Sequence, residues 1–264
     1  MLTEKRQEEI VRLVQERESI TVTELRELLD ASESTIRRDI TALDREGKLT
    51  KVFGGAIAIP TAQMVKKELS VTQKQSLQAA EKQMIAQYAA ALIEPDDCVY
   101  LDAGTTTGWM IDFIREAGAT YVTNALSHAK KLSDKGFRVI LIGGEPKSAT
   151  DAIVGAEAVL NLQKYHFSKG FFGVNGVDRA SGFTTPDVRE AMVKQVAVKN
   201  TQPEQRYFLA TSFKFGEVYA VTFAGFEGGV ILTEAAVSTA LPKTIQVIEV
   251  SSKDGTESLV KVTD

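Results

Sequence analysis

The chain has one cysteine, no long apolar run and no excess of positive charge. Its 264 residues contain Cys98 as the single cysteine, so no internal disulfide can form. No stretch approaches the roughly 18 apolar residues of a membrane-spanning helix. The N-terminus also lacks the apolar core of a secretory signal. These absences argue against a disulfide-rich secreted domain and predict a cytoplasmic protein without a membrane segment.

Charge and composition are those of an ordinary soluble protein. The formal net charge is −4, with 44% hydrophobic and 25% charged residues. An acidic chain gives no independent sign of a nucleic-acid partner. The length is enough for one small and one medium domain, each with its own core.

Residues 31–56, ASESTIRRDITALDREGKLTKVFGGA, begin with an amphipathic helix. Ile36, Ile40 and Leu43 recur at helical spacing and should face a core. Ser32 is a good N-cap, and Gly47 lies where a glycine would end the helix. The opposite face carries small polar and arginine side chains, which can contact phosphates and base edges.

A small basic hairpin should follow this helix. Residues 48–52 alternate in polarity towards Phe53-Gly54-Gly55, and residues 56–59 are apolar again. Upstream, residues 3–16 and 24–29 predict two further helices, with Thr23 capping the second and Leu28 facing inward. Two helices at a sharp turn, followed by a hairpin, predict a winged helix-turn-helix.

The predicted DNA-contacting residues lie on the second helix of this motif and on the hairpin. They are Ser32, Ser34, Thr35, Arg37, Arg38, Thr41, Lys48 and Lys51. The alternative is that Glu33 and Arg37 form only an exposed i, i+4 ion pair. Residues 1–57 hold ten basic and twelve acidic residues, a net −2. DNA binding would therefore depend on local placement and on dimerisation.

After a predicted linker, the chain alternates between helices and strands. A long helix over residues 73–93 should end before Pro95. Predicted strands are residues 98–102, 120–123, 137–142, 169–174, 207–210, 229–233 and 244–250. Predicted helices are residues 107–117, 127–135, 153–163 and 186–200. This alternation predicts a mostly parallel α/β sheet, with a ligand site beyond the C-terminal ends of its strands.

The first of these strands leads into Asp102-Ala103-Gly104-Thr105-Thr106-Thr107 before a helix. Glycine permits close approach of the backbone, and the hydroxyls and helix N–H groups suit an anion. No Gly-Lys-Ser/Thr follows, so this is not a P-loop. A plain turn with a threonine cap is the alternative.

Other predicted strand ends and loops carry glycine and polar residues. These are Asn124, Gly143, Gly144, Asn175, Gly176, Thr184, Thr185, Glu190, Lys194 and Lys214. Taken singly, several have plain explanations. Thr185 could cap a helix that starts with Pro186, and Glu190 with Lys194 could be a surface pair. Together at one sheet edge, these groups suit a small, hydroxyl-rich, anionic ligand.

Both halves resemble the DeoR family of bacterial repressors. The resemblance rests on SESTIRRDITALDREGKLTKVFGGA, LDAGTT, the TN and GG after the next strands, GFTTPDVREAMVKQ and KFG. It implies a winged helix-turn-helix at residues 1–57, a linker at 58–75 and an effector domain at 76–264, with a fold related to ribose-5-phosphate isomerase. Gly104, Thr105 and Thr106 would then hold a phosphate. Asp102, Asn124, Glu190, Lys194 and Lys214 would line the sugar site.

One departure from the family pattern stands beside Lys214. Where the family usually has Asp-Ser-Ser-Lys-Phe-Gly, this chain has Thr211-Ser212-Phe213-Lys214-Phe215-Gly216. The missing aspartate alters the chemistry expected at that edge of the site. Taken as a whole, the sequence is similar to those of repressors of fructose-utilisation operons.

The sequence therefore predicts a homo-oligomeric repressor, dimer or tetramer, that binds double-stranded operator DNA. A phosphorylated sugar, with fructose 1-phosphate as first choice, should release it. One alternative is an isomerase fused to a DNA-binding module, but residues 173–178 offer only Asp178 as an acid. The other is a scaffold that needs no effector. We predict no catalysis, no cofactor and no metal.

Overall fold

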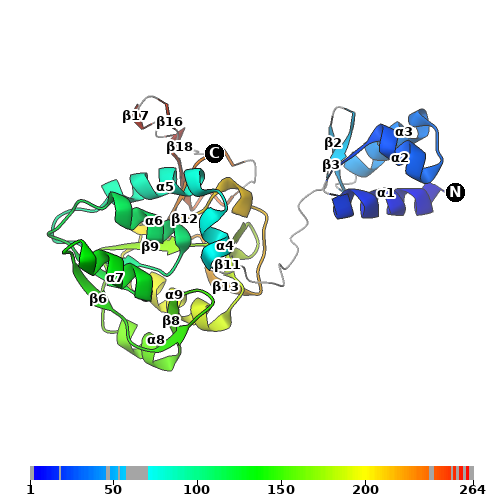
Figure 1. The fold of residues 1–264 in the computed structure, drawn as a ribbon. Helices are drawn as coiled ribbons and strands as arrows, with labels where there is room; N and C mark the ends of the chain where they lie inside the picture. Colours follow the sequence, from blue (N-terminus) through cyan, green and yellow to red (C-terminus); the bar gives the residue numbers. More distant parts are fainter. Residues whose placement is uncertain are drawn as a thin grey trace. The chain divides into compact units, whose positions relative to one another are not determined.

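The computed structural model describes residues 3–17, 19–45, 48–52, 54–57, 71–237 and 241–250, with short segments at 252–253, 256–257 and 260–261. The chain forms two compact units, Met1–Thr61 and Ala62–Asp264 (Figure 1). Each unit has its own hydrophobic core.

The N-terminal unit is a winged helix. Its elements are α1 (Thr3–Arg17), β1 (Ser19–Thr21), α2 (Val22–Leu29), α3 (Glu33–Arg45), β2 (Thr50–Val52) and β3 (Gly55–Ile57). The strands form an antiparallel sheet in the order β1-β3-β2. Ile36, Ile40 and Leu43 are buried as their spacing predicts, and they pack against α1 and α2.

Two predictions about α2 are wrong. The helix begins at Val22, because Thr21 is the N-cap and forms a capping box with Glu24. Leu28 is 49% exposed, since Leu25 and Leu29 occupy the buried side of the helix. The predicted helix stop at Gly47 and the turn residue Phe53 lie outside the described residues.

The C-terminal unit is built on one large sheet. Its strands are β4 (Cys98–Leu101), β5 (Thr120–Thr123), β6 (Arg138–Leu141), β9 (Lys169–Gly173), β12 (Arg206–Leu209), β14 (Gly229–Thr233), β15 (Gln246–Glu249) and β18 (Val260–Lys261). The order is β18-β15-β14-β12-β9-β4-β5-β6. In the described part of the chain the first seven strands in sequence run parallel, and β18 pairs antiparallel with β15.

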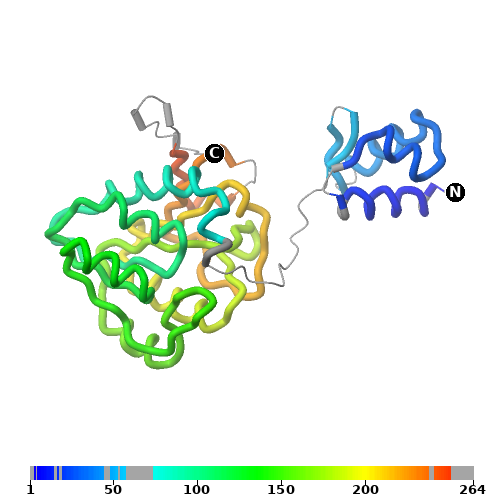
Figure 2. Tube along the Cα trace, in the orientation of Figure 1, coloured from blue at the N-terminus to red at the C-terminus, as the bar shows by residue number. Residues whose placement is uncertain are grey.

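Helices cover both faces of this sheet, as the alternation predicts. On one face α5 (Ala79–Ala91), α6 (Thr105–Phe113) and α7 (Leu126–Asp134) pack on side chains such as Val99 and Leu101. On the other face, Tyr100 belongs to a core shared with α8 (Ala156–Leu162) and α9 (Val188–Lys199). A small sheet of β10 (Gly176–Asp178), β11 (Gly182–Thr185) and β13 (Val221–Ala224) joins that second core. The chain's path between the two faces can be followed in Figure 2.

The predicted single helix over residues 73–93 is two helices. α4 (Val71–Ser76) and α5 are separated at Gln78, whose φ of 51° interrupts the helix. Residues 58–70 of the predicted linker lie outside the described residues, and its last residues belong to α4. Leu77, which lies between the two helices, is 41% exposed. None of the described helices is long and apolar enough to cross a membrane.

Three other predicted helices start at different residues. α6 begins at Thr105, two residues early, and ends at Phe113. α8 begins only at Ala156, because Ile153 lies in β8 (Ala152–Val154), paired with β7 (Glu145–Lys147). α9 is capped by Asp187, whose side chain accepts hydrogen bonds from two backbone N–H groups, rather than by Thr185.

Candidate functional site

The site lies where the order of the parallel strands reverses. From β4 the sheet continues through β5 and β6 in one direction, and through β9, β12, β14 and β15 in the other. Ligands of such sheets bind beyond the strand ends at this point. A pocket occupies it, lined by Asp102, Gly104, Thr105 and Thr106 after β4, and by Gly173 and Asn175 at and after the end of β9.

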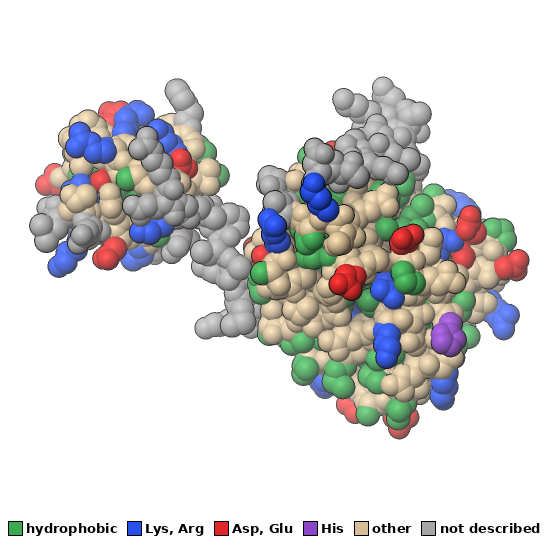
Figure 3. All heavy atoms as spheres, turned by 180° about the vertical axis from the view of Figure 1, so that it is seen from behind, with side chains coloured by type: hydrophobic (Ala, Val, Ile, Leu, Met, Phe, Trp, Pro, Cys, Tyr) green, Lys and Arg blue, Asp and Glu red, His purple; other side chains and the backbone are tan. Residues whose placement is uncertain are grey.

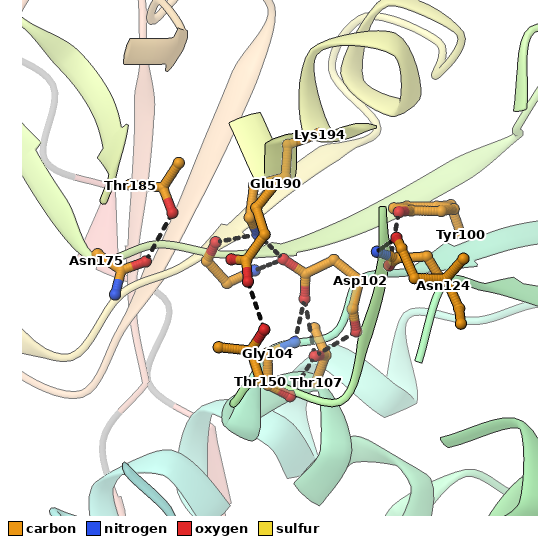
Figure 4. Close-up of polar contacts among 12 residues, drawn as sticks. Tyr100, Asp102, Gly104, Thr107, Asn124, Thr150, Asn175, Thr185, Glu190 and Lys194 are labelled. Atoms are coloured by element: carbon orange, nitrogen blue, oxygen red, sulfur yellow. Dashed lines mark hydrogen bonds and ion pairs between the residues drawn. The ribbon is translucent and has the colours of Figure 1, made fainter. Parts of the chain in front are cut away.

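Asp102 joins four elements at the bottom of this pocket. It is 1% exposed. Oδ1 accepts hydrogen bonds from Gly104 N–H and Thr107 Oγ1, both at 2.9 Å. Oδ2 accepts from Gly173 N–H at 2.7 Å and forms an ion pair with Lys194 of α9 (Figure 4). Asp102 and Lys194 both line the pocket as predicted, but each compensates the charge of the other.

The loop after Asp102 presents the N-terminus of α6 to the pocket. Gly104 is the N-cap and supplies no side-chain hydrogen bond, so the first N–H groups of α6 are not capped by a side chain. A Cβ at Gly104 would lie 2.9 Å from Asp102 Oδ1 and 3.3 Å from Gly173 Cα, which explains the glycine. Thr105 and Thr106 line the pocket. This arrangement of N–H groups and hydroxyls favours an anion.

Three lysines from different elements also line the pocket: Lys74 of α4, Lys82 of α5 and Lys214 of the 3₁₀-helix η1 (Ser212–Lys214). Burial, reinforced by the charge of Lys74, lowers the pKa of both Lys82 and Lys214 to about 8. Neither of these two forms an ion pair among the described residues. Partly buried, mutually repelling cations are stabilised by an anionic ligand. Lys74 and Lys82 were not predicted; their place follows from the packing of α4 and α5.

The remaining polar groups surround this positive region. Glu190 Oε1 accepts from Lys147 Nζ at 3.0 Å and from Thr150 Oγ1 at 2.5 Å. The plain i, i+4 pair of Glu190 with Lys194 does not form, because Lys194 is drawn to Asp102. Asn124 Oδ1 accepts from Tyr100 at 2.9 Å. Figure 4 shows Glu190 with Thr150, and Asn124 with Tyr100.

The structure does not bring every predicted ligand residue to the pocket. Thr107, Gly143, Gly144, Gly176, Thr184 and Thr185 are not among its lining residues. Thr107 donates to Asp102, and Thr185 donates to Asn175 Oδ1 at 3.1 Å. A Cβ at Gly176 would lie 2.1 Å from a backbone oxygen, so its glycine serves packing. Conversely, Thr150, Thr211, Phe213 and Tyr219 line the pocket and were not predicted.

Asp178, the acid in the loop after β9, is also outside the pocket. Its Oδ1 accepts hydrogen bonds from the backbone N–H groups of Ala180 and Ser181, at 3.0 and 2.9 Å. These bonds help to hold its pKa below the usual range, against the opposing effect of burial. It therefore closes a turn. Among the described residues, no cluster of His, Cys, Asp and Glu could hold a metal ion.

The predicted DNA face of the N-terminal unit is exposed or half-exposed at each of its eight residues. Ser32 caps α3, with its Oγ accepting from Thr35 N–H at 3.3 Å. The hairpin is tied to this helix, because Lys51 donates from Nζ to Thr41 Oγ1 at 3.0 Å and from its N–H to Asp44 at 2.9 Å. Figure 3 shows basic side chains gathered on this unit with acidic ones beside them.

Two ion pairs involve α3, and they differ in burial. Arg37 pairs with Glu33 at 2.7 Å while both stay more than half exposed, so the arginine is free to exchange partners. The buried Asp39 pairs with Arg6 of α1 at 2.6 Å, which anchors α3 to α1. The sequence pattern did not single out Asp39.

Residues 6–62 match the DeoR-like helix-turn-helix domain, and residues 77–233 match the DeoR C-terminal sensor domain. The chain belongs to the DeoR family. As a member it is a DNA-binding transcriptional repressor of the sugar-operon type with a small-molecule sensor domain, and it is not an enzyme. The predicted family, fold class and absence of catalysis are confirmed.

Several relatives of this chain are named as transcriptional regulators or repressors. The chain is 40% identical to the uncharacterized HTH-type transcriptional regulator FruR of Bacillus subtilis, over 89% of this chain and 92% of that one. It is 39% identical to the lactose phosphotransferase system repressor of Streptococcus mutans, over 82% and 86%. The Staphylococcus aureus repressor of the same name is 38% identical, over 81% and 84%.

Similar solved structures are distant. Ribose 5-phosphate isomerase A of Neisseria gonorrhoeae has a TM-score of 0.38 and 10% identity, covering 56% of each chain. The translation initiation factor eIF-2B of Pyrococcus horikoshii has a TM-score of 0.36 and 13% identity, covering 83% of this chain and 74% of that one. Likenesses of this size do not bear on the function of this DeoR-family chain.

Proposed function

We propose that this repressor is released from its operator when a phosphorylated sugar binds the pocket between β4 and β9. The observation that carries the proposal is that Lys82 and Lys214 share one pocket with the N-terminus of α6. Fructose 1-phosphate is the first choice, because relatives include a regulator named FruR and repressors of a sugar phosphotransferase system.

The charges of the pocket favour a phosphate ester over a free sugar. Asp102 compensates Lys194, and Lys147 compensates Glu190, which leaves the lysines on α5 and η1 without a carboxylate partner among the described residues. A dianionic phosphate supplies the negative charge that these lysines lack, and it accepts hydrogen bonds from the N–H groups of α6. Asn124, Asn175 and Glu190 can bind sugar hydroxyls nearby.

Release requires that the effector binds the DNA-incompetent state more tightly. A coupling free energy of about 1–3 kcal/mol would change operator affinity roughly 5–150-fold. In this proposal residues 1–57 bind the operator, residues 58–75 link the domains and residues 76–264 bind the effector. The protein acts in the cytoplasm as a homo-oligomer, because one small DNA-binding module gives limited discrimination against genomic DNA.

The test is operator binding by the full chain, using an operator that the chain itself selects from a DNA pool. We expect fructose 1-phosphate to weaken binding and free fructose to have little effect. A Lys82→Ala/Lys214→Ala variant should bind the operator and fail to respond, whereas the exposed-site control Lys130→Ala should respond normally. Operator binding that ignores every sugar phosphate would instead support a scaffold that needs no effector.

A further inference from the structure

Two neighbouring arginines on α3, the recognition helix of the helix-turn-helix, differ in their partners. Arg37 donates from Nε and Nη2 to the same oxygen, Oε1 of Glu33, at 2.9 and 2.7 Å. Arg38 is exposed, and its side chain forms no ion pair with any residue that the structure describes. The exposed face of α3 therefore carries one arginine whose charge is compensated and one whose charge is not.

The contacts of Arg37 leave a defined set of its donors free. A guanidinium has five N–H donors in one plane. Two of them point to Glu33, so both N–H groups of Nη1 and one of Nη2 remain. These groups lie at the end of the side chain, where Nη1 and Nη2 form a fork that matches O6 and N7 of guanine.

A phosphate is a poor partner for this pair. Ionised carboxylates only accept hydrogen bonds, and the phosphates of DNA also offer acceptors and negative charge. Glu33 therefore repels the DNA backbone and cancels the charge by which Arg37 would attract it. The edges of the bases in the major groove are better matched, because guanine offers two acceptors to the arginine and cytosine offers an amino donor to the carboxylate.

The position of the pair on α3 also suits the major groove. Glu33 is the first residue of α3, and the N-terminal residues of a recognition helix contact base edges. Arg37 follows one turn later, and its carbonyl accepts a hydrogen bond from Thr41 Oγ1 at 2.8 Å. Thr41 in turn accepts from Lys51 of the hairpin at 3.0 Å. The pair thus belongs to a polar stripe that runs from the start of the helix to the hairpin.

General helix properties explain why the pair forms but not its use of a DNA-binding face. An acid in the first turn and an i, i+4 ion pair both stabilise a helix modestly. In water the exposed pair exchanges partners easily. When DNA displaces that water, the charge-assisted hydrogen bonds strengthen, and the orientation of the guanidinium becomes fixed.

We propose that Glu33 is a positioning residue for sequence recognition. It holds the Nε side of Arg37, so that Nη1 and Nη2 read a guanine in the major groove of the operator. The carboxylate lowers the affinity for DNA of any sequence and raises the preference for one G·C base pair. Specificity of this kind comes from a repulsive element as well as an attractive one.

The test measures base preference and general DNA affinity separately. The full chain and its variants each select DNA from a randomised pool. Competition titration then compares the selected operator, single-base-pair changes of it and random-sequence DNA. We expect the parent chain to prefer G·C about tenfold at a position where Arg37→Ala shows no preference. Glu33→Ala should lose most of that preference and bind random-sequence DNA at least as tightly as the parent. Glu33→Gln keeps an acceptor for Arg37 and should retain part of the preference.

Control variants separate this role from a general one. Arg38→Ala should keep the preference at that position, whatever its overall affinity. Glu9→Ala removes an exposed acid that pairs with Arg12 on α1, and it should match the parent in base preference and in affinity for random-sequence DNA. If Glu33→Ala loses the circular dichroism spectrum of the parent, Arg37→Lys replaces it. This change keeps the charge but removes the fork, so it should lose the base preference and keep the affinity for random-sequence DNA.

Three results would overturn the proposal. The first is a Glu33→Ala chain that keeps the full preference at the Arg37 position. The second is a Glu33→Ala chain with the parent's circular dichroism spectrum that binds both operator and random-sequence DNA more weakly, which marks a structural role. The third is an Arg37→Ala chain that weakens binding to all sequences equally and lowers the salt slope by about one, which marks a phosphate contact.

Discussion

Asp102 and Lys194 form a buried ion pair that connects the end of β4 to α9 across 92 residues of sequence. Lys194 Nζ also donates to the carbonyl of Gly173 at 2.9 Å. The pair thereby fixes the strand ends on both sides of the reversal point, together with the loop that starts α6. Its main role is to position Gly104 and Gly173.

Breaking this pair should destabilise the C-terminal unit. Lys194→Met leaves the carboxylate of Asp102 buried without its cation, at a cost of about 3–5 kcal/mol. Urea unfolding of the full chain measures the difference. Lys199→Met, an exposed change on the same helix, should stay within about 0.5 kcal/mol of the parent. Equal effects of the two substitutions would contradict the structural role of the pair.

Effector binding should depend on pH through the lysine pocket. The pKa of Lys82 and of Lys214 is lowered to about 8, so both lose charge as the pH rises through 8. A phosphate ester gains its second charge near pH 6. Affinity for a sugar phosphate should therefore be highest between about pH 6 and 8 and fall above 8. Calorimetry at pH 8 in buffers of different ionisation enthalpy should show proton uptake on binding; proton release there would contradict the assignment.

The same lysines should make folding stability rise with pH in the absence of ligand. Their pKa is near 8 when folded and about 10.4 when unfolded, so the unfolded chain binds more protons between these values. The destabilisation is fully present below about pH 8 and is relieved as the pH approaches 10.4. Urea unfolding at pH 8 and at pH 9.5 compares the free energy of unfolding at the two pH values. Lys82→Ala/Lys214→Ala should flatten this rise, and an identical rise in that variant would assign it to other groups.

Thr105 should contribute to effector affinity and not to operator affinity. Thr105→Val keeps the side-chain shape but removes a hydroxyl from the pocket, which should cost roughly 1–3 kcal/mol if a phosphate oxygen loses its donor. The variant should then need about tenfold more effector for release. Gel-shift titration measures both quantities. An unchanged effector response would remove this hydroxyl from the phosphate site.

Arg37 and Arg38 should contact the operator. Both are exposed on α3, so Arg37→Ala or Arg38→Ala should leave the fold intact and weaken operator binding by about 1–3 kcal/mol. Arg12→Ala, an exposed arginine on α1 that is also ion-paired within its helix, is the matched control. Parent-like binding by both α3 variants would show that the recognition helix is assigned wrongly.

The sequence by itself determined the local parts of this protein. The spacing of Ile36, Ile40 and Leu43, with the cap at Ser32, placed the recognition helix, because helix periodicity and capping depend on neighbouring residues. The loop at Gly104 was likewise readable, since a glycine between a strand and a helix indicates close backbone approach.

Tertiary structure alone decided how the charges are paired. Spacing along α9 suggests that Lys194 pairs with Glu190, but packing places it against Asp102, and Glu190 takes Lys147 instead. Lys82 reaches the pocket because Gln78 breaks the predicted long helix and α5 packs along α6. Ion pairs between distant segments depend on which surfaces the core brings together, and residue spacing within one segment carries no information about that choice.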